Sequence, residues 1–78
     1  MRDVIVYSRK QCHLCDELKE QLRRLDDGRL FRWQEVDIDT DPKLQQLYNH
    51  EVPVVFIDGR KAFKYRLDEC EFLRKLQS

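Results

Sequence analysis

The feature that most constrains this chain is a pair of cysteines, Cys12 and Cys15, placed where an apolar strand gives way to an amphipathic helix. The strand is predicted over residues 3–7, where β-branched residues are frequent, and the helix over residues 13–26, where leucines recur at helical spacing. A thiol at the start of a helix meets backbone N–H groups without partners and the positive end of the helix dipole. Both favour the thiolate, so Cys12 is the expected nucleophile.

The spacing of the two cysteines predicts that they act together. Positions three apart lie on the same face of a helix, so Cys15 is placed to attack a mixed disulfide that forms at Cys12. A disulfide between them closes only a very small loop and would constrain the unfolded chain very little. We therefore expect the pair to cycle between dithiol and disulfide rather than to serve as a structural cross-link.

The length and composition limit the class of protein. The 78 residues are enough for one modest core, so we expect a single domain over residues 1–78. Fifteen basic and fifteen acidic residues cancel, which removes the electrostatic argument for a nucleic-acid or membrane partner. The sequence has an odd number of cysteines, no signal-peptide core and no apolar run of membrane-spanning length. We expect a monomeric cytoplasmic protein with no nucleic-acid or membrane partner.

The middle of the chain predicts an edge strand and a short helix. Residues 30–38 mix apolar and charged side chains, which is typical of a partly exposed strand. Trp33 is expected to pack on this strand rather than to bind a ligand. The sequence Thr-Asp-Pro at residues 40–42 then indicates a helix start, with Thr40 or Asp39 as the N-cap and proline in the first turn.

The last third of the chain predicts a hairpin and a final helix. Asp58-Gly59 is a favoured tight turn between two apolar runs, and His50, in the loop before them, is expected to be solvated. Asp68, with a glutamate three residues on, resembles a capping box for a helix that begins there. Cys70 is placed on the inward side of this helix and is expected to be a small buried residue.

The predicted order is β-α-β-α-β-β-α, which gives two parallel strands joined by a helical crossover and then an antiparallel hairpin. This four-stranded mixed sheet flanked by three helices is the α/β architecture of the minimal thioredoxin-like fold. Cys-His-Leu-Cys is typical of a group of small glutaredoxin-like proteins. The chain resembles the glutaredoxin-like branch of the thioredoxin superfamily over nearly its whole length, in that motif, in Tyr7-Ser8-Arg9, in Val52-Pro53 and in Phe56-Ile57-Asp58-Gly59.

The resemblance implies a thiol–disulfide oxidoreductase with a glutaredoxin-type fold. It implies that Pro53 is cis and lies against the cysteines, and that the backbone of Val52 pairs with an extended substrate or glutathione. Arg9 matches a basic residue that often meets the glutathione carboxylate, and its charge would also favour the Cys12 thiolate. His13 has two interpretations: its imidazolium stabilises that thiolate, or it is an exposed first-turn residue without effect.

Departures from the family pattern bear on the use of glutathione. His13 and Leu14 stand where glutaredoxins commonly carry proline and tyrosine. The glycine pair that follows the hairpin in glutathione-binding members is replaced near Phe63-Lys64, and the polar pair beyond it by Arg66. These changes remove room for the γ-glutamyl end of glutathione. Glutathione is therefore disfavoured as a co-substrate, and no bound cofactor is required.

Two other classes of function stay open from the sequence. One is a binding module that keeps the scaffold with little turnover, because a fold does not fix a function. The other is a zinc site in which the cysteine pair joins Cys70 or a histidine, although a structural zinc site usually has a second close-set pair, which this sequence lacks. The main prediction is a dithiol oxidoreductase for protein or small-molecule disulfides. Its expected site comprises Cys12 and Cys15 as the reacting thiols, Val52, Pro53 and Arg9 as substrate-binding residues, and His13 as the residue that tunes the thiolate.

Overall fold

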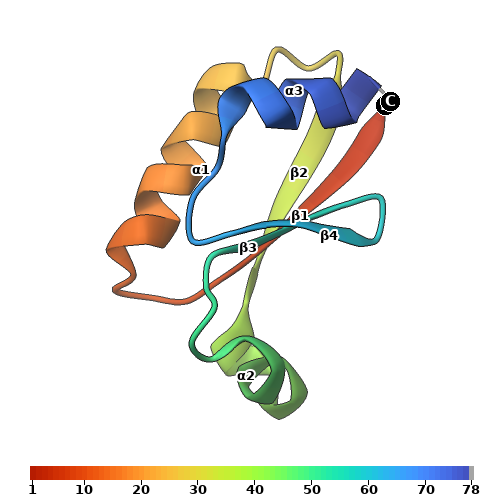
Figure 1. The fold of residues 1–78 in the computed structure, drawn as a ribbon. Helices are drawn as coiled ribbons and strands as arrows, with labels where there is room; N and C mark the ends of the chain where they lie inside the picture. The colour runs from red at the N-terminus through yellow and green to blue at the C-terminus, as the bar shows by residue number, and fades with distance from the viewer. Residues whose placement is uncertain (78) are drawn as a thin grey trace.

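The computed structural model describes residues 1–77 and contains a four-stranded sheet with three α-helices (Figure 1). The order of elements along the chain is the predicted one, with boundaries that differ by one or two residues. The elements are β1 Arg2–Ser8, α1 His13–Leu25, β2 Phe31–Asp37, the short 3-10 helix η1 Ile38–Thr40, α2 Pro42–Tyr48, β3 Val54–Ile57, β4 Arg60–Lys64 and α3 Glu69–Gln77.

The strands lie in the order β2-β1-β3-β4, so β1 is central and β2 is an edge strand, as predicted. β1 and β2 are parallel, with Val4 opposite Trp33, and they require the crossover that α1 supplies. β3 is antiparallel to both of its neighbours, and the hairpin turns at Asp58-Gly59. The predicted mixed α/β architecture is therefore confirmed.

The main core lies between the sheet and the helices α1 and α3. Alternate residues of β1 face it, because side chains along a strand point to opposite faces of the sheet. The rings of Phe31 and Phe72 meet edge to face there, with their centroids 5.1 Å apart. The buried members of this core are Val4, Val6, Leu18, Leu22, Phe31, Val55, Ile57, Leu67, Phe72 and Leu76.

The helix α2 packs on the opposite face of the sheet, near the end of β1. Tyr7 faces away from the main core, because it follows the inward-facing Val6 along the strand. Its ring stacks on that of Tyr48 at 4.9 Å and meets the edge of Phe56 at 5.4 Å. These aromatic contacts fix α2 against β1 and β3 at the end of the sheet from which the chain continues to the cysteines.

The predicted cap of α2 is wrong. Asp41 caps this helix, and its carboxylate accepts a hydrogen bond from the backbone N–H of Lys43 at 2.9 Å. Thr40 and Asp39 do not cap it, because the chain first makes the 3-10 helix over Ile38–Thr40. This added turn places the N-cap at Asp41, directly before the proline with which α2 begins.

The predicted burial of Cys70 is also wrong, because its side chain is exposed. The buried side of α3 is set by Phe72, which is fully buried, and by Leu76. A residue two positions before Phe72 is turned by about 200° around the helix axis, since a helix has about 3.6 residues per turn. Cys70 therefore faces solvent.

Candidate active site

The two cysteines lie where β1 leads into α1. Cys12 is the N-cap residue of α1: its sulfur accepts a hydrogen bond from the N–H of Cys15 at 3.2 Å, and its carbonyl accepts one from Asp16 at 3.1 Å. The two sulfurs are joined as a disulfide, and the Cα atoms are 5.2 Å apart. Cys12 is partly exposed, whereas Cys15 is fully buried. Of the pair, Cys12 is therefore the one that a partner molecule reaches.

Pro53 is buried directly before β3, and the Val52–Pro53 peptide bond is cis, as the resemblance implies. The antiparallel pairing of β3 with β1 places Val54 opposite Tyr7. Pro53 therefore lies at the end of the sheet from which β1 continues to Cys12. Within residues 1–77, the backbone N–H and C=O of Val52 make no hydrogen bond, which leaves both available to the backbone of a ligand.

Tyr65 ties the exit of β4 to the segment that precedes β3. Its N–H donates to the carbonyl of Pro53 at 2.8 Å, and its hydroxyl donates to the carbonyl of His50 at 3.0 Å. Its backbone is left-handed, with φ of 70°. Tyr65 could not be predicted from the sequence, because glycine and asparagine are the usual residues in that conformation and a tyrosine gives no local signal.

Arg9 is held by an ion pair at the end of β1. Its guanidinium contacts the two carboxylate oxygens of Asp39 at 2.7 and 3.3 Å and donates to the carbonyl and side-chain oxygens of Asn49 at 3.2 and 2.7 Å. The hydrogen bond from Arg9 lowers the pKa of Asp39 below its ordinary value, and the same contact raises the pKa of Arg9. Asp39 thereby offsets part of the charge that Arg9 was expected to present to Cys12 or to a substrate. Its role in substrate binding stays a prediction.

His13 lies in the first turn of α1 with 86% of its side chain exposed. Its Nε2 atom is 3.2 Å from Oε1 of Glu17, one turn along the helix. The carboxylate of Glu17 would offset part of the charge of a protonated imidazole. Its expected effect on the Cys12 thiolate stays a prediction.

A polar network that was not predicted from the sequence lies beside the loop that leads to Cys12. Ser8 is fully buried, and its hydroxyl donates to Glu35 at 2.5 Å, while the ammonium of Lys19 donates to the same carboxylate oxygen at 2.8 Å. The bonds from Lys19 and Ser8 lower the pKa of Glu35 below its ordinary value. The network joins the last residue of β1 to α1, one turn after Cys15. The inward position of Ser8, after Val4 and Val6, is the signal that a polar partner was needed.

Within residues 1–77, no group of three histidine, cysteine, aspartate or glutamate side chains is arranged to hold a metal ion. None of the helices in that range has the length and apolar character to span a membrane.

Comparison with known proteins places these features in a family. The sequence profile of the glutaredoxin-like domain (DUF836) matches residues 3–77. Protein Ne2328 from Nitrosomonas europaea is 34% identical, with a TM-score of 0.81 over 95% of this chain and 89% of that one. The X. campestris protein XcR50 is 31% identical, with a TM-score of 0.77 over 95% of each chain.

A third structural neighbour has a longer chain. Glutaredoxin C1 from Populus tremula x tremuloides is 24% identical, with a TM-score of 0.63 over 95% of this chain and 73% of that one. It shares the fold, which confirms the predicted thioredoxin-like architecture. No curated protein sequence matches the chain.

Proposed function

The chain belongs to the glutaredoxin-like domain family, and we propose that it is a thiol–disulfide oxidoreductase that works through Cys12 and Cys15. One observation carries the proposal: the partly exposed Cys12 is the N-cap of α1 and is disulfide-bonded to the buried Cys15. The helix start stabilises a thiolate at Cys12, and the second sulfur lies within bonding distance of the first.

The reaction proceeds in two thiol–disulfide exchanges. In the reduced protein the Cys12 thiolate attacks a substrate disulfide; a mixed disulfide forms, the substrate S–S bond breaks, and the first substrate thiolate leaves and takes a proton from water. The Cys15 thiolate then attacks the Cys12 sulfur and releases the second substrate thiolate, which is also protonated. The substrate gains two electrons, and the protein becomes the Cys12–Cys15 disulfide. An external thiol reductant returns the pair to the dithiol form.

The remaining site residues hold the substrate and the loop. An extended substrate pairs with the free backbone groups of Val52 beside Pro53. Arg9 keeps a guanidinium at the end of β1, where it meets a substrate carboxylate beside its bond to Asp39, and His13 tunes the Cys12 thiolate. The cycle requires no bound cofactor, and a dithiol that must be re-reduced fits a reducing compartment such as the cytoplasm, where we expect the protein to act as a monomer.

Trapping of the mixed disulfide tests this proposal. In a Cys70→Ser background, the further substitution Cys15→Ser is expected to leave a substrate mixed disulfide on Cys12, detected by mass spectrometry. The matched Cys12→Ser variant should trap none at Cys15. Absence of trapping in the first variant, or equal trapping in both, would contradict the proposal. A protein disulfide and a glutathione mixed disulfide, offered to the same preparation, then show which substrate class turns over.

A further inference from the structure

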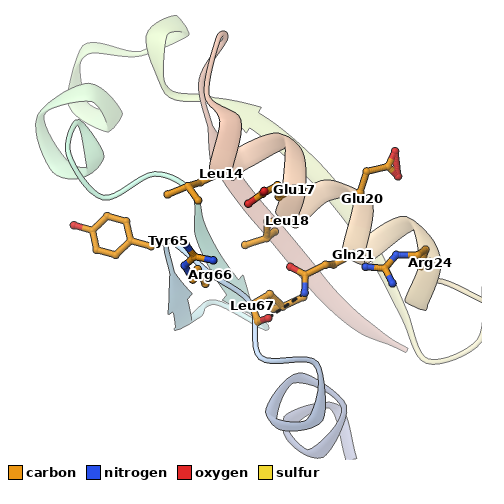
Figure 2. A pocket seen from close by; sticks show the side chains of 9 residues that line it. All are labelled: Leu14, Glu17, Leu18, Glu20, Gln21, Arg24, Tyr65, Arg66 and Leu67. Atoms are coloured by element: carbon orange, nitrogen blue, oxygen red, sulfur yellow. Dashed lines mark hydrogen bonds between the residues drawn. The ribbon is translucent and has the colours of Figure 1, made fainter.

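A groove of about 440 Å³ begins within the cysteine motif and runs along α1 (Figure 2). Its apolar lining comes from Leu14, which stands between the two cysteines, and from the buried Leu18 and Leu67. The wall opposite α1 is the loop between β4 and α3, where Tyr65 and Arg66 project (Figure 2). A ligand in this groove therefore lies next to the redox pair.

Polar contacts hold the two walls of the groove together at its far end. Gln21 donates from Nε2 to the carbonyl of Leu67 at 3.2 Å and to the carboxylate of Glu69 at 3.0 Å. Nη2 of Arg24 lies 3.5 Å from the same carboxylate. These contacts join α1 to the start of α3, so the width of the groove is set by the folded structure.

Arg66 differs from the other charged side chains that line the groove. Within residues 1–77, its exposed guanidinium makes no ion pair or hydrogen bond, and only its backbone N–H is used, by the carbonyl of Lys64 at 2.8 Å. An exposed guanidinium beside an apolar surface is complementary to a carboxylate on an apolar ligand. The other charged lining residues each have a partner: Glu17 with His13 at 3.2 Å, Glu20 with Arg23 at 3.5 Å, and Arg24 with Glu69 at 3.5 Å.

We propose that this groove selects a polypeptide substrate with an apolar side chain and a carboxylate near its disulfide, and that Arg66 binds the carboxylate. The proposal rests on the oxidoreductase function and names its substrate class. The apolar side chain packs on Leu14 and on the exposed ring of Tyr65, while the guanidinium of Arg66 forms paired N–H···O bonds to the carboxylate. Arg66 is thus a specificity-determining residue.

The length of the groove favours a polypeptide over glutathione. From Leu14 to Arg24, α1 rises by about 15 Å, at about 1.5 Å per residue. An extended chain covers that distance with about four or five residues, at about 3.3 Å each, which exceeds a tripeptide. The hydrogen bond from the N–H of Tyr65 to the carbonyl of Pro53 holds the loop that carries Arg66 beside the unpaired backbone groups of Val52. One extended substrate segment can therefore contact both Arg66 and the backbone of Val52.

Binding of redox-inert peptides tests the proposal without any need for turnover. Each labelled peptide carries a serine in place of the substrate cysteine and a leucine next to that serine. One glutamate is placed, in successive peptides, at the second, third or fourth position on either side of the serine. A matched set carries glutamine. Fluorescence anisotropy should show, for at least one position, about tenfold tighter binding of the glutamate peptide. The substitution Arg66→Ala should remove this preference, and Arg66→Glu should reverse it toward a lysine peptide.

The control is Arg60→Ala, which removes an exposed arginine at the hairpin end of β4, away from the groove. It should keep the preference of the unaltered protein. Equal affinity for the glutamate and glutamine sets at every position overturns the proposal, as does a preference that survives Arg66→Ala or that Arg60→Ala also removes. Reduction of 2-hydroxyethyl disulfide, which is small and neutral, is measured separately as a single turnover, in which the pre-reduced Cys12 and Cys15 thiols supply the two electrons. Charge-selective binding without that turnover would contradict the oxidoreductase function, while the binding of a peptide carboxylate by Arg66 would stand.

Discussion

The sulfur of Cys12 accepts a hydrogen bond from the backbone N–H of Cys15 at 3.2 Å, so the more accessible cysteine of the pair is also the one that caps α1. A negatively charged sulfur gains more from this contact, and from the helix dipole, than a neutral thiol does. Accessibility and thiolate stabilisation therefore favour the same residue as nucleophile.

The first prediction is that Cys12 is alkylated faster than Cys15. In a reduced Cys70→Ser background, iodoacetamide at about pH 6.5 should modify Cys12 about tenfold faster or more, because its thiolate is stabilised and Cys15 is fully buried. Peptide mapping by mass spectrometry at short times measures both rates. Faster modification of Cys15 would assign the nucleophile to the other thiol.

The second prediction concerns the pH dependence that Glu35 gives to stability. Lys19 and Ser8 lower the pKa of Glu35 in the folded protein, so its ionised form stabilises the fold above the ordinary glutamate pKa, and this contribution is lost as the pH falls through the lowered pKa. Glu35→Gln should cost about 1 kcal/mol at pH 7, since the carboxylate is partly exposed and its ion pair is screened by solvent. Urea unfolding should show this difference shrinking below about pH 4.

The exposed Glu20 is the matched control for that series. Its carboxylate lies 3.5 Å from Arg23 and 66% of its side chain is exposed, so Glu20→Gln should change stability very little at any pH. A Glu35→Gln difference that grows on acidification would contradict the assignment of the network.

The third prediction compares two positions of α3, Cys70 and Phe72, which are two residues apart. Cys70→Ser should change the free energy of unfolding by less than about 0.5 kcal/mol, because the side chain is exposed. Phe72→Ala should cost about 3–5 kcal/mol, because its fully buried ring packs against Phe31. Urea denaturation of both variants measures the two values. Similar costs at the two positions would mean that the helix buries a different face.

The fourth prediction concerns the use of glutathione. Phe63 packs against the core and lies 6.5 Å from the Phe72 ring, so glycine there would weaken the fold. The side chain of Lys64 is 52% exposed, so a substitution there tests the space available to glutathione without disturbing the core. We expect glutathione-dependent turnover to be weak; Lys64→Gly should raise it by up to about tenfold, and Lys64→Ala should raise it less because a Cβ atom remains. Equal effects of the two substitutions, or high turnover in the unaltered protein, would show that space at this position is not limiting.

The parts of the fold that depend on local chemistry could be predicted from the sequence. The leucine spacing of α1, the Asp58-Gly59 turn and the capping carboxylate of Asp68, which accepts from the N–H of Glu71, are each properties of a few adjacent residues. Cys70 was misplaced because a short helix with several apolar residues offers more than one apolar face. The packing of Phe72 against Phe31, which is distant in sequence, decides which face is buried.

In the candidate site, too, local sequence motifs could be predicted and long-range contacts could not. The cysteine motif and the proline could be located because each is a short pattern next to a predicted strand or helix. The partners of Arg9, Ser8 and Tyr65 could not, because they are 12 to 40 residues away in sequence and only the packed sheet brings them together. The capture of Arg9 by Asp39 is the clearest case, since neither residue alone signals the pair.

The hydrogen bond from Nε of Arg2 to the carbonyl of Leu76, at 3.1 Å, joins the beginning of β1 to the last turn of α3. β1 then runs through seven residues, about 20 Å, before the chain reaches the cysteine loop. Fluorescent reporters or surface tethers attached through either residue 1 or residue 77 would thus emerge at the same corner, away from the disulfide. The protein could be immobilised on an electrode by that corner while its reacting sulfur stays open to solution.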